Sequence, residues 1–144
     1  MYKALILTIL LASCTPYQSR GIFGGWYETQ HDENVYNVAF HGNGYTSIQR
    51  ATDLTLLRCA ELTVGYGYRY FTVIESNSHR SVSTTKAGDN IYTVTRPRTQ
   101  NRIVMSREKL YVESYNAALV EQSVREQYGI NEDRMRRRDR DRLR

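Results

Sequence analysis

Large apolar residues recur at every second position early in the part of this chain that reads as folded. Within residues 35–41, the side chains from Tyr36 to Phe40 alternate between large apolar and smaller or polar ones, a period typical of a strand buried on one face. Residues 25–30 predict a second strand, and Asp-Glu-Asn at 32–34 suits a hairpin turn. We therefore expect the first two elements to form an antiparallel pair.

A three- and four-residue period replaces this alternation over residues 48–64 and predicts an amphipathic helix. Thr46 and Ser47 are suitable caps for its start, because a hydroxyl accepts hydrogen bonds from the free first-turn amides. Gly65 or Gly67 suits its end, because glycine adopts the left-handed conformation easily. The apolar positions are Ile48, Ala51, Leu54, Leu57, Ala60 and Val64, with Leu56, Cys59 and Leu62 widening the stripe.

So wide a stripe predicts that this helix is pressed against a sheet. Cys59 lies within the stripe, where a thiol packs as a small hydrophobe, so we interpret it as a core residue rather than a reactive one. The residues expected to remain well exposed are Gln49, Arg50, Asp53, Arg58 and Glu61.

The rest of the chain predicts more strands and a second helix. Residues 68–75 are rich in aromatic and β-branched side chains and predict a central strand, whereas the polar residues 77–89 predict a flexible connection or a binding loop. Further strands are expected at 90–95 and 102–106, around Arg96-Pro97-Arg98, with 109–113 as a candidate last strand and a helix at 117–128 that Gly129 ends. The predicted fold class is α+β, a small antiparallel sheet of about four to six strands with one long helix on a face and a shorter C-terminal helix.

The first 14 residues are of a different kind. Lys3 gives a cationic start, residues 4–11 form an apolar run, and Leu-Ala-Ser-Cys at 11–14 forms a small-residue cleavage site, the layout of a secretory signal peptide. Leu-Ala-Ser-Cys also resembles the lipobox of bacterial lipoproteins, which implies a diacylated Cys14 with cleavage before it. The run is shorter than the roughly 20 apolar residues that a spanning helix needs. We expect an anchor without a span; a soluble export signal or an apolar first strand of a cytosolic protein are the alternatives.

The anchor divides the chain into four parts. Residues 1–13 are the expected signal peptide, 14–24 the lipidated cysteine and a tether, 25–131 the domain and 132–144 a tail. Thr15 follows the cysteine where an aspartate would resemble an inner-membrane retention signal. The expected location is therefore the bacterial cell envelope, at the outer membrane facing the periplasm if the host is Gram-negative.

The formal charge of +5 is placed mainly in the tail. Residues 132–144 hold seven arginines against four acidic residues, whereas residues 14–131 are nearly neutral. The tail is expected to be disordered or helical, because it has almost nothing to bury. Export argues against nucleic acid as its partner and favours anionic lipid or glycan, with a solubilising role as the alternative. The candidate contacts are Arg134, Arg136, Arg137, Arg138 and Arg140.

Several segments together resemble a family of small bacterial lipoproteins that have no assigned biochemical function. They are Gly25-Trp26-Tyr27-Glu28, Asp32-Glu33-Asn34 with Gly42-Asn43-Gly44-Tyr45-Thr46, Leu57 to Thr63, Gly67-Tyr68-Arg69-Tyr70-Phe71 and Tyr115-Asn116-Ala117. The resemblance covers most of residues 25–129 and does not include the arginine-rich tail. It implies anchoring and an α+β domain, and it transfers no catalytic residue.

The residues themselves indicate no established catalytic arrangement. His31, Asp32 and Glu33 are neighbours in a predicted turn and point in divergent directions, without a second cluster at metal-ligand spacing. Serines surround His79, yet no strained-turn motif of the kind Gly-x-Ser-x-Gly is present. We therefore expect no catalytic residue, no metal, and no cofactor other than covalent lipid on Cys14.

The expected function is non-catalytic binding or scaffolding in the envelope, with an envelope protein or an anionic lipid or glycan as partner. One alternative is an envelope hydrolase or metal-dependent enzyme centred on His31, His41 or His79. Another is a polyanion-binding module that acts through the arginine-rich tail.

Overall fold

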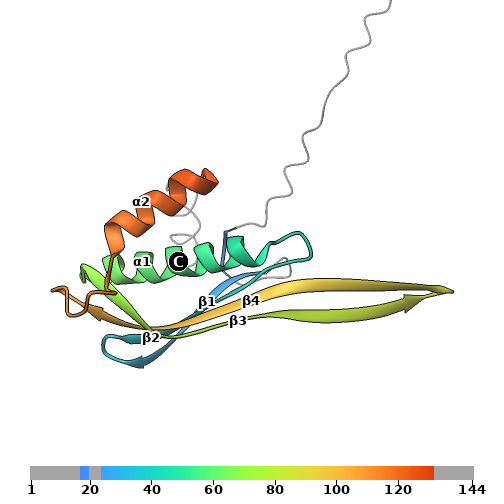
Figure 1. The fold of residues 1–144 in the computed structure, drawn as a ribbon, viewed down its shortest axis with the longest axis horizontal. Coiled ribbons are helices and arrows are strands. Elements are labelled where there is room, and N and C mark those ends of the chain that lie inside the picture. The colour runs from blue at the N-terminus through green and yellow to red at the C-terminus, as the bar shows by residue number, and fades with distance from the viewer. Residues whose placement is uncertain (1–16, 20–23, 132–144) are drawn as a thin grey trace, which may run out of the picture.

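A computed structural model describes residues 17–19 and 24–131 of the chain, and Figure 1 shows two helices stacked over one face of a sheet. Residues 1–16, which include Cys14, and the tail 132–144 lie outside the described residues. The elements are β1 (Gly25–Asp32), β2 (Val35–His41), α1 (Ile48–Gly65), β3 (Tyr70–Ala87), β4 (Asn90–Ser106), β5 (Tyr115–Asn116) and α2 (Ala117–Tyr128).

The sheet has five antiparallel strands in the order β1-β2-β4-β3-β5, which confirms the predicted α+β class. β1 and β2 form the expected hairpin, with Trp26 opposite Phe40 and Tyr27 opposite Ala39. The prediction of a central strand at 68–75 is wrong in position, because β4 occupies the middle of the sheet and β3 lies beside it. Helix α1 connects β2 to β3 and therefore crosses the sheet.

The polar stretch 77–89 is not a loop, since most of it belongs to β3. Nor do 90–95 and 102–106 form two strands, because β4 is continuous through Pro97. The Ser/Thr-rich stretch contains β-branched residues, and every residue from Glu75 to Ala87 has a partner in β4. Pro97 has no N–H to donate, and it is tolerated because this side of β4 faces the place where β2 has just ended. Its carbonyl, on the same side, accepts a 2.9 Å hydrogen bond from the Gly42 N–H.

The candidate last strand at 109–113 is also wrong. Those residues form bends and a turn, and the strand that follows, β5, has two residues that pair with Tyr70 and Phe71. Ser114 holds the turn in place, because its hydroxyl accepts from the Tyr111 N–H at 3.2 Å and hydrogen-bonds the Thr72 hydroxyl at 2.8 Å. Side-chain bonding to the backbone thus competes with extended pairing here.

The ends of both helices follow the predicted chemistry. Ser47 caps α1, with its hydroxyl accepting from the Arg50 N–H at 3.0 Å. Of the two glycines proposed for the end of that helix, Gly67 adopts the left-handed conformation, at φ +81°, directly after the C-cap Tyr66. Gly129 ends α2 in the left-handed conformation, at φ +60°. The prediction that Arg58 and Glu61 are well exposed is wrong, because α2 packs on the outer side of α1 and leaves their side chains only 13% and 10% exposed.

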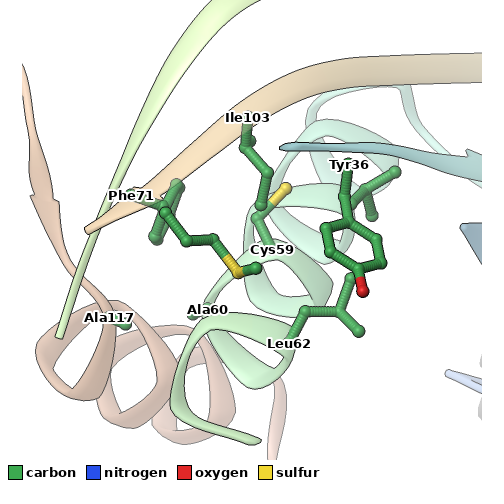
Figure 2. Packing of buried hydrophobic residues seen from close by; sticks show 9 residues of the cluster. Tyr36, Cys59, Ala60, Leu62, Phe71, Ile103 and Ala117 are labelled. Carbon is green, nitrogen blue, oxygen red and sulfur yellow. The ribbon is translucent and has the colours of Figure 1, made fainter. Parts of the chain in front are cut away.

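The core lies between the sheet and α1 in two adjoining clusters. In the cluster of Figure 2, Tyr36, Phe71 and Ile103 of the sheet meet Cys59 and other residues of the helices. Cys59 is fully buried, which agrees with its interpretation as a core residue, and burial raises the pKa of its thiol to about 12. The second cluster joins Trp26 and Phe40 to Ala51, Leu54, Leu57 and Val124.

The outer part of the β3–β4 hairpin extends well beyond the helices (Figure 1). We call residues 80–96 of this hairpin the arm; its turn contains Gly88 at φ +61°. Val82, Ile91 and Tyr92 of the arm are all more than half exposed. The arm therefore stands outside the core as a two-stranded ribbon.

Candidate functional site

One face of the sheet packs against α1, and the opposite face, which we call the open face, carries polar side chains in cross-strand rows. Successive residues of a strand point to opposite faces, so the neighbours of core residues such as Phe40 share the open face. Three consecutive rows can be read from the register. They are Thr29–Asn37–Arg102–Glu75, Tyr27–Ala39–Gln100–Asn77 and His41–Arg98–His79.

The middle row contains a hollow. Ala39 lies between the longer Tyr27 and Gln100, and a small side chain among longer ones leaves a depression of about 240 Å³. Ala39 itself is only 3% exposed, because the neighbouring side chains rise around it. The hollow is lined by Tyr27, Ala39, His41, Asn77, His79, Arg98, Thr99 and Gln100.

A chain of hydrogen bonds satisfies the first row. The Asn37 amide nitrogen lies 2.8 Å from Nε2 of His31, and its oxygen accepts from Nε of Arg102 at 3.0 Å. Arg102 in turn forms an ion pair of 3.1 Å with Glu75. The guanidinium in this row is therefore neutralised within the protein.

The last row, unlike the first, contains an arginine but no carboxylate. Arg98 pairs with His41 of β2 on one side and with His79 of β3 on the other. The His41 and Tyr27 rings pack in a T-shaped arrangement, with ring centroids 5.0 Å apart and planes at 90°. Within residues 17–19 and 24–131, no ion pair involves Arg98. This row presents one uncompensated guanidinium between two imidazoles.

The histidines named in the enzyme alternative thus share the open face, but the structure brings only His41 and His79 to one hollow. The described part of the chain contains no group of three or more His, Cys, Asp or Glu side chains placed to hold a metal ion. Ser76 points to the helix-covered face and donates to the Asn101 side chain at 2.8 Å. Ser83 accepts from Arg96 at 3.2 Å.

A larger groove of about 790 Å³ follows α2 and the end of α1, and it includes Val64, Glu121 and Glu126. Its acidic groups already have partners, because Glu121 pairs with Arg125 at 3.1 Å and Glu126 accepts from Gln122 at 2.9 Å. The hollow on the open face is therefore the stronger candidate for recognising a charged ligand.

Residues 17–19, expected to be part of a tether, pack on the domain instead. Tyr17 is only 8% exposed and its ring lies 6.5 Å from that of Trp26. Its hydroxyl donates to Glu61 at 2.5 Å, and the Gln18 carbonyl accepts from the Trp26 N–H at 2.8 Å. Gly25 permits this approach, because a Cβ built there would lie 2.3 Å from the Gln18 carbonyl oxygen.

Glu61 is the centre of a largely buried ion network, to which the Tyr17 hydroxyl also donates a hydrogen bond. It pairs with Arg58 at 3.2 Å and with Arg125 of α2 at 2.5 Å. Arg58 also pairs with Glu28 of β1 at 2.9 Å and stacks over Trp26, with 3.5 Å from its guanidinium carbon to the ring centroid. Burial raises the pKa of Glu61, while its bonds to Tyr17 and the two arginines act in the opposite direction. Burial and the nearby Glu61 also raise the pKa of Tyr17 well above its ordinary value.

The position of Tyr17 could not be found by sequence reasoning, because no local period marks a single aromatic residue 44 positions from its partner. The lipidation site Cys14 and the candidate contacts Arg134, Arg136, Arg137, Arg138 and Arg140 lie outside the described residues. Among the helices that the structure describes, none is long and apolar enough to cross a membrane. No protein-family model, curated protein or solved structure matches the chain.

Proposed function

We propose that this chain is a lipid-anchored protein of the bacterial cell envelope that binds a partner without catalysis. Cys14 carries the lipid in this proposal, following Leu-Ala-Ser at the end of an apolar run. If the host is Gram-negative, the proposed location is the outer membrane, facing the periplasm. The folded domain then presents its binding surface close to that membrane.

The observation that supports binding is the asymmetry of the sheet. Its inner face is covered by α1, whereas its open face exposes three rows of hydrogen-bonding side chains around a hollow. Concave places with a few converging polar groups are the usual sites of ligand recognition. The proposal therefore places the binding surface on the open face, rather than on the residue 77–89 loop expected from the sequence.

The enzyme alternative has one specific observation in its favour, the shared hollow of His41 and His79. Both imidazoles are suited to proton transfer when a substrate lies between them. Replacing all three histidines by alanine separates the proposals. An unchanged fold and an unchanged cellular phenotype would eliminate the enzyme, whereas one equivalent of bound metal in the natural protein would support it.

The anchor is tested with Cys14→Ser. In cells fed a radiolabelled fatty acid, the natural protein should incorporate label and the variant should remain an unlabelled precursor. Label that persists in the variant contradicts the anchor. A serine substitution at Cys59 is the matched control, because that thiol is fully buried and should not affect labelling.

The binding role is tested by crosslinking in cells, with a photoreactive residue at Gln100 on the open face and, as control, at Gln49 on the exposed side of α1. We expect one dominant adduct from Gln100 only. Equal capture from both positions contradicts an open-face site. Repeating the experiment without residues 132–144 tests the tail alternative, which predicts that all capture is lost with the tail.

A further inference from the structure

We propose that the row His41–Arg98–His79 and the adjoining hollow form a binding site for the phosphate ester of a small polar ligand. This inference deepens the proposed binding function and rests on it. Two of the residues, Arg98 and His79, are exposed, and all three line the same hollow. The hollow is therefore accessible from solvent.

The charges around the hollow favour an anion. Arg98 has no ion-pair partner within the described residues, whereas Arg102, two open-face rows away on the same strand, pairs with Glu75. The arginine at the hollow is thus positioned to accept an external negative charge. A guanidinium offers planar, paired N–H donors that match the oxygens of phosphate and carboxylate.

The neighbouring groups extend this donor set. His41 and His79 lie on the strands either side of β4, so their backbone positions are roughly 9–10 Å apart and Arg98 lies between them. An imidazole donates an N–H in either charge state, and it carries a positive charge when doubly protonated. Asn77 and Gln100 add amide N–H donors in the next row. A tetrahedral phosphate offers more acceptor oxygens to such a set than a carboxylate does.

The size of the hollow selects a small group. Its volume of about 240 Å³ lies below the roughly 300–1,000 Å³ of pockets for drug-sized ligands. Tyr27 contributes an aromatic side chain to the lining, against which the uncharged part of the ligand can pack, and Ala39 contributes a small methyl group. A sugar phosphate or a phospholipid headgroup has this combination of one phosphate and a compact polar body.

The test is calorimetric titration of the mature lipidated protein, which begins at Cys14, in micelles of a neutral detergent. Glucose 6-phosphate and dihexanoyl phosphatidylglycerol are the two probes, and glucose is the uncharged control. We expect binding of at least one phosphate probe, none of glucose, and a loss of affinity at high salt. Binding only of the sugar phosphate assigns a glycan-like source, and binding only of the lipid assigns a headgroup.

Arg98→Gln should weaken this binding by about tenfold or more, since it removes a charge-assisted hydrogen-bonding pair. Arg102→Gln is the matched control on the same strand and face, and it should change affinity by less than about twofold because Arg102 is already paired. His79→Gln, at an exposed position, provides a second variant if Arg98→Gln fails to fold.

The absence of binding of both phosphate probes, or equal affinity in the Arg98 and Arg102 variants, overturns the phosphate site. Crosslinking from Gln100 in cells then distinguishes the two levels of the proposal. Capture that persists in the Arg98→Gln protein leaves the open-face binding role in place without its phosphate site. If the photoreactive residue at Gln100 captures no partner in the otherwise natural protein, the binding role itself is contradicted.

Discussion

Gly25→Ala should release residues 17–19 from the domain. Gly25 has φ +127°, which an L residue rarely adopts, and a Cβ there would lie 2.3 Å from the Gln18 carbonyl oxygen and 2.8 Å from that of Ser19. These contacts are with backbone atoms, so no rotation of a side chain relieves them. The chain must therefore move away from β1, and Tyr17 with it.

The size of the loss follows from two contributions. Strain at such a φ costs about 1–3 kcal/mol. Exposure of the buried Tyr17 ring adds about 2 kcal/mol. We therefore expect the free energy of unfolding to fall by about 3–5 kcal/mol in Gly25→Ala. Gly88→Ala is the matched control, because φ is also positive there, at +61°, but no atom lies within 4 Å of the added Cβ. Its cost should be about 1–2 kcal/mol.

Urea titration followed by fluorescence of the only tryptophan, Trp26, gives both free energies. Hydrogen exchange at the Trp26 amide reports directly on the bond to Gln18. We expect fast exchange of this amide in Gly25→Ala under native conditions and slow exchange in Gly88→Ala. Equal losses of stability in the two variants, or a Trp26 amide that stays protected in Gly25→Ala, would refute the reasoning.

Three further predictions concern the core and its caps. Glu61→Ala should lower the free energy of unfolding by about 3 kcal/mol, because two largely buried arginines lose a partner. Glu75→Ala, at a side chain that is 63% exposed, should cost less than about 1 kcal/mol, so equal costs in urea titrations would contradict the network. Cys59 should react with thiol reagents only as fast as the protein unfolds, so rapid labelling of the native protein would disprove its burial. Because burial raises the pKa of this thiol to about 12, its contribution to stability is complete below about pH 9 and is lost as the pH rises toward 12. Ser47→Ala should cost about 1 kcal/mol through the lost cap of α1, and Ser47→Asp should restore most of it, so failure of the rescue would count against capping.

Local patterns predicted the elements whose form depends on neighbours in sequence. The period of residues 48–64 placed α1 to within one residue, and Ser47 and Gly129 marked helix ends through their own conformations. The β1–β2 hairpin likewise combines alternation with a short turn. In each case the signal and the structure that it specifies lie within a few residues of one another.

The sequence predicted poorly where the structure depends on distant partners. Polar residues around Val82 form a strand only because β4 lies beside them, and composition alone suggested a loop. Arg58 and Glu61 are covered by a helix some 60 residues later, as the bond from Arg125 to Glu61 shows. The hollow at Ala39 requires the register of four strands, so its residues were named in part but not brought together.

If Cys14 carries the proposed lipid, the docking of Tyr17 on the domain limits how far the domain can lie from the bilayer. Only two residues, Thr15 and Pro16, separate it from Cys14, and the three residue steps from Cys14 to Tyr17 span at most about 11 Å when fully extended. A protein held this closely by an acylated Cys14 diffuses laterally along the membrane surface, without the wide range of positions that a long flexible tether allows. Its collisions are then confined to a thin layer at the membrane. Partners resident in that layer meet it at a high effective concentration, whereas a partner bound elsewhere in the envelope must come to it.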